Sequence, residues 1–251
     1  MLAPPRDPNK ALRKRRNACL RMLTLFHHPF CPHSRFIRLA LGEYGISARL
    51  VEERVWERRE EFLAINPAGT TPVLVEEGHP PIPGAGIIAE YLDETRGPEL
   101  GRLRLLPSES GGRVEVRRLL SWFNDKFFAE VTGPLTMERL YKRHLPVSAG
   151  GGSPETDVIR VARHNIRYHL AYIGWLAGTR DWLAGEQMSY ADLAAASHLS
   201  VADYLGDVPW NEDEMAKTWY ARLKSRPAFR PLLAETLPGV PASETYANLD
   251  F

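Results

Sequence analysis

The sequence predicts a protein of two parts, a mixed α/β part over residues 22–96 and an all-helical part over residues 113–236. In the first part, short runs rich in β-branched residues alternate with stretches whose apolar residues recur at helical spacing. In the second part only the helical spacing recurs. The stretch GPELGRLRLLPSESGG (97–112) separates the two, and its glycines and prolines are typical of a linker.

The α/β part begins with MLTLFHH (22–28), an alternating, β-rich run that predicts a buried strand. A helix follows, with Pro32 suited to its first turn and Gly45 at its end. The next patterns predict a strand at SARLVEE, a short helix at ERREEFLAI, two short strands at TPVLVEEG and HPPI, and a third helix at GIIAEYLDETRG. This order, β-α-β-α-β-β-α over about 80 residues, is typical of a thioredoxin-like layer.

The all-α part begins with a helix over 113–131, which we expect Gly133 and Pro134 to break or kink. The tail, residues 237–251, has two prolines and no periodicity, so we expect no regular structure there. Between them the pattern predicts helices over 134–145, from the end of the loop SAGGGSPETD to about 177, over 189–205, over about 212–225, and briefly after Pro227.

Composition limits the classes of function. The chain has 251 residues, of which 44% are hydrophobic and 25% charged, as in ordinary globular proteins. Its two cysteines, Cys19 and Cys31, cannot form a disulfide framework, so the sequence indicates a reducing compartment. No apolar run approaches the roughly 20 residues that a membrane-spanning helix needs, so we expect no membrane insertion.

Positive charge is concentrated at the start of the chain. Residues 1–21 hold seven Lys and Arg against a single acid, Asp7. We interpret this segment as a basic, disordered extension and expect no nucleic-acid partner. An arm for nucleic acid or anionic lipid is the alternative.

Two motifs, NPAGTTPVL (66–74) and GEQMSYADLAAA (185–196), together with the order of the elements, resemble the glutathione S-transferase superfamily. The resemblance implies the glutathione S-transferase fold. It also implies a cis peptide bond before Pro72, which turns the backbone of Thr71 toward a ligand. In the second motif Ser189 and Asp192 form an S-x-x-D capping box at a buried helix start, so Asp192 is structural and not catalytic.

In this superfamily an acid and a serine at the start of the third helix hold the γ-glutamyl part of glutathione. Counting back from Tyr91 places Gly84 and Ala85 at these positions, and neither has a polar side chain. Losing two hydrogen bonds to charged groups weakens binding by roughly a hundredfold to ten-thousandfold. We therefore expect no cofactor and no glutathione transferase activity. The alternatives are compensation by Glu77 or His79 and a register shifted by one residue.

The stretch HHPFCPHS (27–34) contains the candidate nucleophile. Cys31 stands at a helix start, where a thiolate is stabilised, and so resembles the reactive residue of cysteine-type transferases. Ser34 stands where a C-x-x-C motif has its second cysteine, so we interpret it as a helix-start hydroxyl. Cys31 is either a working nucleophile or an inert thiol. The histidines of this stretch imitate metal ligands, but no second ligand pair follows at zinc-site spacing, so we expect no metal. The predicted remnant of a ligand site thus comprises Cys31, Ser34, Thr71, Pro72, Gly84 and Ala85.

Two features are typical of partner contacts. Trp56 lies among charges in VEERVWERREE, so we expect at least partial exposure, as in an interface anchor. The final YANLDF places Tyr246, Leu249 and Phe251 around Asp250, which suits a short interaction motif. A tail that packs on its own domain is the alternative. We interpret the run WFNDKFF (122–128) as core and dimer seam.

A narrower resemblance rests on LFHHPFCPHSRFIRLALGE, EERVWERREEFLAINPAG, VADYLGDVPW, the missing acid-serine pair and the final LDF. The chain is similar to the FtsZ-binding, glutathione S-transferase-like division proteins of alphaproteobacteria (the FzlA type). This resemblance implies a homodimeric scaffold that binds FtsZ filaments in the cytoplasm at the division site, without enzymatic activity, through residues near Tyr246 to Phe251. A dimer that presents two copies of one surface can bridge or curve filaments. The alternative is a glutathione S-transferase or thiol transferase that uses Cys31.

Overall fold

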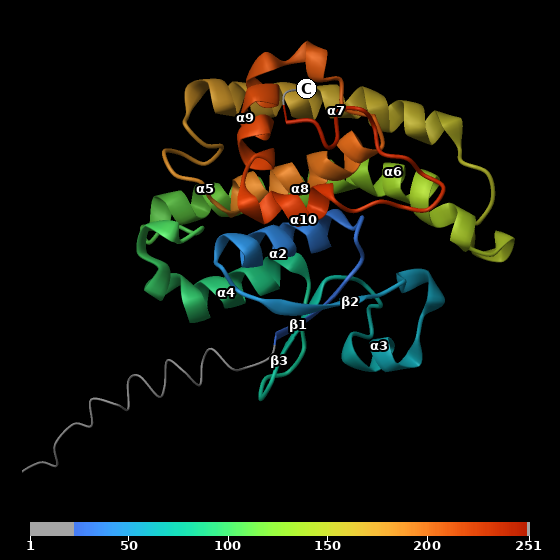
Figure 1. The fold of residues 1–251 in the computed structure, drawn as a ribbon, viewed down its shortest axis with the longest axis horizontal. Coiled ribbons are helices and arrows are strands. Elements are labelled where there is room, and N and C mark those ends of the chain that lie inside the picture. The colour runs from blue at the N-terminus through green and yellow to red at the C-terminus, as the bar shows by residue number, and fades with distance from the viewer. Residues whose placement is uncertain (1–22, 250–251) are drawn as a thin grey trace, which may run out of the picture.

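The computed structural model describes residues 23–249, which form a small sheet flanked by helices and a larger all-helical part packed on it (Figure 1). This architecture confirms the predicted fold class. The basic segment 1–21, Met22, Asp250 and Phe251 lie outside the described residues.

Four strands form the sheet, in the order β2-β1-β3-β4. β1 (Leu23–His27) runs parallel to β2 (Ala48–Glu52) and antiparallel to β3 (Val73–Glu76). β4 (Ile82–Pro83) pairs antiparallel with β3. Each of these strands was predicted from the alternating or β-rich runs.

Helices cover both faces of the sheet because alternate residues of β1 point to opposite sides. α3 (Glu60–Ile65), preceded by the single turn η1 (Val55–Glu57), covers the side of Phe26, whose ring centroid lies 5.8 Å from that of Phe62. α2 (Pro32–Glu43) and α4 (Ala85–Leu100) pack on each other and cover the opposite side. α2 therefore lies between the sheet and the helical part.

The helical part begins with α5 (Ser110–Ser121), which continues without a break through the π-helical segment η3 (Trp122–Thr132), α6 (Gly133–Thr136) and η4 (Met137–Tyr141). The predicted break at the Gly133–Pro134 pair is absent, because the helical path runs from η3 through α6 into η4, with the proline at the second residue of α6. The wider turns of η3 directly precede it.

α8 (Tyr190–Tyr204) is the central helix of the second part, since all of its residues are buried and it packs against α2. The predicted capping box is present at its start, where Oδ2 of Asp192 accepts from the backbone N–H of Ser189 at 2.9 Å. One apolar core thus extends from the sheet through α2 to α8. The remaining elements are α7 (Thr156–Thr179), α9 (Glu214–Lys224), α10 (Arg230–Leu233) and the short turns η2 (Gly101–Leu103), η5 (Lys142–His144), η6 (Val147–Ala149), η7 (Trp210–Glu212) and η8 (Pro227–Phe229).

Residues 237–249 form neither helix nor strand and lie against the helical part (red in Figure 1). α4 reaches Leu100 and α5 begins at Ser110, so helical structure extends into both ends of the expected linker. None of the helices within residues 23–249 has the length and apolar character that a bilayer crossing requires.

Candidate ligand cleft and partner surfaces

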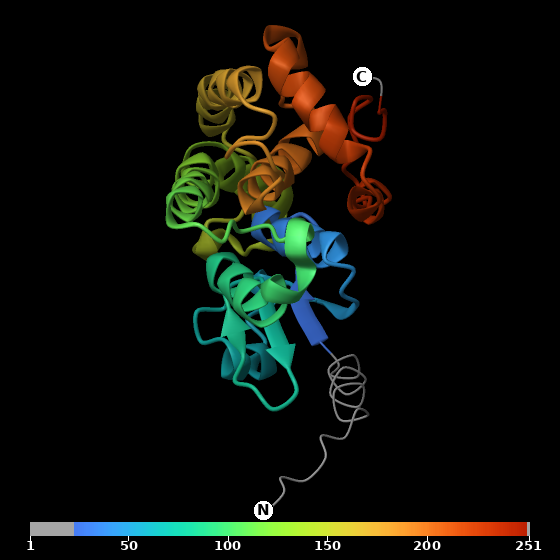
Figure 2. The same ribbon diagram turned by 90° about the vertical axis from the view of Figure 1, so that its left-hand side faces the viewer.

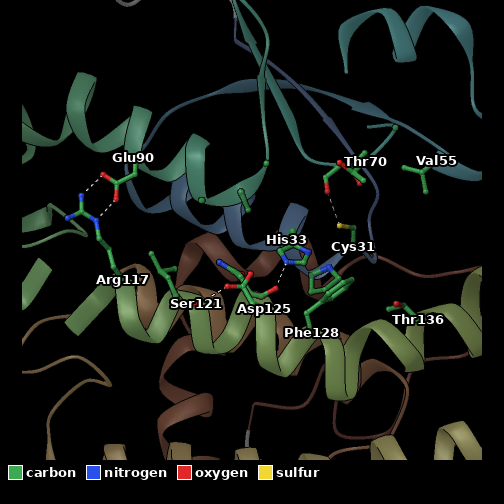
Figure 3. Close-up of a pocket in the computed structure, with 18 of the residues that line it drawn as sticks. Cys31, His33, Val55, Thr70, Glu90, Arg117, Ser121, Asp125, Phe128 and Thr136 are labelled. Carbon is green, nitrogen blue, oxygen red and sulfur yellow. Dashed lines mark hydrogen bonds and ion pairs between the residues drawn. The ribbon is translucent and has the colours of Figure 1, made fainter. Parts of the chain in front are cut away.

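A cavity of about 700 Å³ lies between the two parts of the molecule (Figure 3). The starts of α2 and α4 line it on the sheet side, and η3 lines it on the helical side. Ser34 and Pro72 are buried behind the lining, and the Thr71–Pro72 bond is cis, as predicted. The lining brings together the other four residues of the predicted ligand-site remnant, Cys31, Thr71, Gly84 and Ala85.

Cys31 is the N-cap of α2, as predicted, and its sulfur lies 3.6 Å from the carbonyl oxygen of Thr71. Burial by itself raises the pKa of this thiol, but hydrogen bonds with His33 and Ser34 and the charge of His33 outweigh burial and lower the pKa to about 7. Burial lowers the pKa of His33, whereas its hydrogen bond and charge interaction with Cys31 raise it above the ordinary value. The Cys31 thiol is therefore partly ionised near neutral pH. Sequence reasoning missed the role of His33, although it stands only two residues away.

The opposite end of the cleft lacks polar side chains at the start of α4. Gly84 is the N-cap, with a φ of 90° that favours glycine, and Ala85 is the first helical residue. No side chain caps this helix start. Neither Glu77 nor His79 is among the described residues that line the cavity, so neither substitutes for the missing pair.

Acidic and basic side chains both line the cavity. Glu90 and Asp125 contribute to the lining, and Arg117 is the sole Lys or Arg among the lining residues that the structure describes. Two guanidinium nitrogens of Arg117 donate to Glu90 at 2.7 and 2.8 Å, so this cation is already paired.

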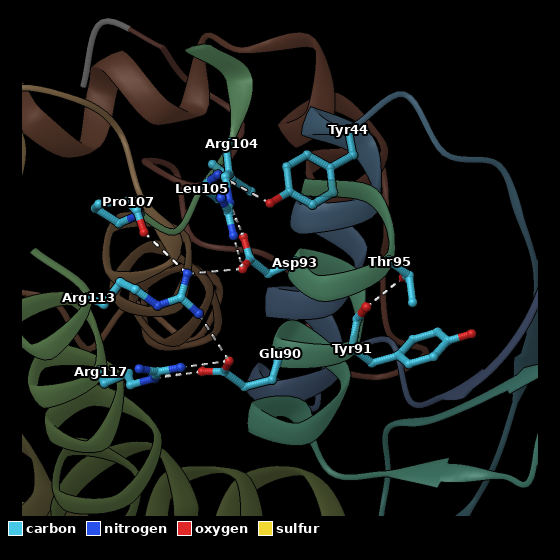
Figure 4. Close-up of polar contacts among 10 residues, drawn as sticks. All are labelled: Tyr44, Glu90, Tyr91, Asp93, Thr95, Arg104, Leu105, Pro107, Arg113 and Arg117. Carbon is cyan, nitrogen blue, oxygen red and sulfur yellow. Dashed lines mark hydrogen bonds and ion pairs between the residues drawn. The ribbon is translucent and has the colours of Figure 1, made fainter. Parts of the chain in front are cut away.

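Beside the cleft, a ladder of ion pairs joins α4 to the chain that follows it (Figure 4). It passes from Glu90 to Arg113 at 3.8 Å, and from Arg113 to the fully buried Asp93 at 3.3 Å. Asp93 also pairs with Arg104 at 2.7 Å. Gly97 makes this approach possible, because a Cβ there would lie 2.7 Å from Oδ1 of Asp93. Sequence reasoning took this glycine as a linker signal and missed the ladder.

His27 and His28 are buried, and their surroundings indicate a structural role. Burial, helped by neighbouring arginines, lowers the pKa of His27 to about 3 and that of His28 to about 4, so both stay neutral at physiological pH. Nδ1 of His28 accepts a hydrogen bond from the backbone N–H of Phe30 at 3.3 Å. Across residues 23–249, no group of three His, Cys, Asp or Glu side chains gathers as metal ligands would.

Trp56 is partly buried, in agreement with the expected partial exposure. Its ring stacks on that of His144 with centroids 4.8 Å apart. The rings of His28 and Tyr141 each lie 5.3 Å away. Because His144 and Tyr141 belong to the helical part, Trp56 joins the two parts while part of its side chain stays exposed.

The position of Tyr246 contradicts its predicted role as a partner contact in the tail. Its ring is 1% exposed, lies 4.9 Å from the ring of Tyr204, and its hydroxyl donates to a backbone carbonyl of α10 at 2.5 Å. Tyr246 therefore packs on its own domain, since burying this large ring and pairing its hydroxyl is favourable, and it is not an accessible partner contact. Leu249 is 43% exposed and stays a candidate contact, whereas Asp250 and Phe251 lie outside the described residues.

The run 122–128 has two sides. Its phenylalanines at 123 and 127 are fully buried, as the core interpretation expects. On the other side Trp122 lies 6.0 Å from the ring of Tyr168 and 4.6 Å from that of Tyr172, both on α7. Tyr168 and Trp175 are 60% and 58% exposed. We call Trp122, Tyr168, Tyr172 and Trp175 the outer aromatic patch. Trp122 belongs to η3 and the other three to α7, and these two helices pack side by side (green and golden in Figure 2).

Comparisons with known proteins agree with this fold. The family model of the glutathione S-transferase N-terminal domain matches residues 25–100, and that of the C-terminal domain matches residues 131–227. FtsZ-localized protein A of Caulobacter vibrioides is 47% identical over 233 residues, which cover 91% of this chain and 98% of that protein.

Solved structures give the same result. A glutathione S-transferase from Sinorhizobium meliloti is 52% identical with a TM-score of 0.89, and the match covers 92% of this chain and 100% of that one. FzlA from C. crescentus is 46% identical with a TM-score of 0.84, again over 92% of this chain and 100% of the other. The chain belongs to the glutathione S-transferase family, in the group that contains FtsZ-localized protein A.

Proposed function

We propose that this protein is a homodimeric, non-enzymatic FtsZ-binding protein that acts on FtsZ filaments in the cytoplasm at the division site. The observation that carries the proposal is the 47% identity to FtsZ-localized protein A over 91% of the chain. The apolar pair Gly84 and Ala85 at the start of α4 supports the absence of glutathione chemistry.

The proposed FtsZ contact includes the exposed end of the tail and the exposed part of Trp56. Arg143 donates to the carbonyl of Pro238 at 3.4 Å, so the beginning of the tail contacts the turn η5 that also carries His144, the residue stacked on Trp56. The tail ends beyond Leu249, which is exposed. An exposed leucine next to a fixed backbone suits the apolar centre of a small interface.

The outer aromatic patch supports the homodimer. Monomeric proteins rarely expose several large aromatic side chains together, and interface centres are enriched in Trp and Tyr. A second copy of this chain is the proposed occupant, because a two-fold axis through the patch pairs it with itself. Two tails on one dimer would then engage two filament subunits at once.

Co-sedimentation with FtsZ filaments assembled with GTP tests the proposal. Two truncations sharpen it, one lacking residues 245–251 and one lacking only 249–251, which leaves the buried Tyr246 in place. We expect the intact protein in the pellet and both truncated forms in the supernatant. Intact protein that stays in the supernatant contradicts FtsZ binding, and a 249–251 truncation that still pellets moves the contact away from the exposed end.

One observation favours a second candidate, a thiol transferase. The Cys31 thiol, with a pKa lowered to about 7, faces a cavity of about 700 Å³ beside the cis peptide bond of Pro72. Such a thiol is nucleophilic at neutral pH. A glutathione-dependent thiol-exchange assay on the wild type and on Cys31→Ala decides this candidate, since only activity that the substitution abolishes supports it.

A further inference from the structure

Lys224, the last residue of α9, is a buried cation that holds the tail. Its side chain has no exposed surface, and its Nζ donates to the backbone carbonyls of Thr245 and Asn248, each at 2.7 Å. Oδ2 of Asp203, on α8, lies 3.5 Å from the same Nζ. A single ammonium group thus ties two carbonyls of the tail, three residues apart, to the body of the molecule.

Asp203 binds the same stretch of the tail. Its Oδ1 accepts from the hydroxyl of Thr245 at 2.7 Å, and its backbone carbonyl accepts from the hydroxyl of Ser243 at 2.6 Å. Oδ1 also accepts from the indole N–H of Trp210 at 2.9 Å, which fixes the carboxylate independently of the tail. Lys224 and Asp203 together therefore hold residues 243–248 against the body of the molecule. The next residue, Leu249, is the last one described and is exposed.

A lysine at this position is not explained by core packing. Burying an ion pair is often no more stabilising than filling the space with apolar side chains, because both ions lose their hydration. Burial accordingly lowers the pKa of Lys224, against the opposing effect of Asp203. What the ammonium provides, and an apolar side chain cannot, is hydrogen bonds to two backbone carbonyls of the tail at once.

We propose that Lys224 is a positioning residue for partner binding, which fixes the course of the tail through Asn248 and so presents Leu249 in a defined direction. This inference rests on the proposed function, because it assigns a presenting role to the tail that contacts FtsZ. A tail held in one conformation binds without first losing its conformational entropy. Lys224 itself does not contact the partner.

The test needs a variant that releases the tail without leaving a buried charge. Lys224→Met alone leaves Asp203 uncompensated and endangers folding. The double variant Lys224→Met/Asp203→Asn removes both charges and retains an oxygen at Oδ1 for its two donors. Arg222→Met is the matched control. Arg222 is an exposed cation on the same helix, and its side chain donates to the carbonyl of Asp181, away from the tail.

Two quantities are measured on each variant: amide hydrogen exchange of the tail peptides, and the affinity for GTP-assembled FtsZ filaments by co-sedimentation. In the double variant we expect exchange over 243–248 to accelerate by roughly tenfold or more while core peptides keep their protection, and FtsZ affinity to fall by roughly tenfold. Arg222→Met should match the wild type in both.

The outcomes separate this inference from the proposed function. Unchanged tail exchange in the double variant overturns the holding role of Lys224. Faster exchange with unchanged FtsZ affinity overturns its role in presentation, provided that removing residues 249–251 abolishes binding. If that truncation leaves binding intact, the proposed function of the tail fails, and the presenting role fails with it whatever the exchange shows.

Discussion

The thiol of Cys31 allows a quantitative test of the cleft. Its pKa is lowered from an ordinary value of 9.0 to about 7, because hydrogen bonds and the charge of His33 outweigh the effect of burial. His33→Ala removes the contributions of His33 and leaves burial, the largest single effect, opposed only by the hydrogen bonds with Ser34, so we expect the pKa of Cys31 to rise to near the ordinary value. The measurement uses a Cys19→Ser background, in which Cys31 is the remaining cysteine of the chain.

The size of the effect follows from the thiolate fraction. At pH 7 a thiol with a pKa of about 7 is half ionised, whereas one with a pKa of about 9 is ionised to about 1%, a difference of about fiftyfold. A thiolate of higher pKa is also more nucleophilic, by about six- to tenfold over two units. The net loss of alkylation rate at pH 7 is therefore about five- to eightfold.

The assay is the rate of iodoacetamide labelling, followed by mass spectrometry from about pH 5.5 to about pH 9.5. Wild-type labelling should slow as the pH falls below about 7, the pKa of the thiol, because protonation removes the nucleophile. In His33→Ala the same decline should begin near pH 9. His164→Ala, an exposed histidine on α7, should follow the wild type. A wild-type midpoint above about 8.5, or the same midpoint in His33→Ala, refutes this account of the cleft.

Three further predictions concern the ladder, the tail and the dimer. Asp93→Asn breaks a buried ion pair, so it should lower the free energy of unfolding, measured by urea titration, by about 3 kcal/mol. In the same titration the control Asp157→Asn, which breaks an exposed pair, should change the free energy of unfolding by less than about 0.5 kcal/mol. Tyr246→Ala empties a buried aromatic site, so it should lower the free energy of unfolding by about 3 to 5 kcal/mol. A loss below about 1 kcal/mol in the same titration would contradict the docking of the tail. Trp175→Glu should halve the mass measured by sedimentation velocity without lowering Tm, whereas Val147→Glu, exposed outside the patch, should leave the mass unchanged.

The fold was predictable where the sequence has strong local patterns. β1 and α8 follow from an alternating run and from a capping box before an apolar segment, and both are signals contained within a few residues. The prediction of a break at Gly133–Pro134 was wrong because the effect of the proline depends on its position within a helix and on the π-helical turns before it. Gly97 was taken as a linker residue, but its lack of a side chain lets Asp93 and Arg104 approach each other beside it, which depends on tertiary packing.

The site was predictable only in part. The positions of Cys31 and of the apolar pair at the start of α4 follow from sequence motifs. Tyr246 was misassigned because the tail has no periodicity and the residues that hold it, on α8, α9 and α10, are distant in the sequence. The outer aromatic patch likewise combines two helices, so its exposure depends on tertiary packing that no single helical pattern reveals.

The central claim is that this member of the family binds its partner through surfaces outside the ligand cleft. Co-sedimentation of Cys31→Ala with GTP-assembled FtsZ filaments tests that claim most directly, because the substitution removes the thiol of the cleft and touches neither the tail nor Trp56. We predict that Cys31→Ala pellets with the filaments as well as the wild type does. A Cys31→Ala protein that is folded, as judged by its wild-type Tm, and yet stays in the supernatant would contradict the account and return the function to the cleft.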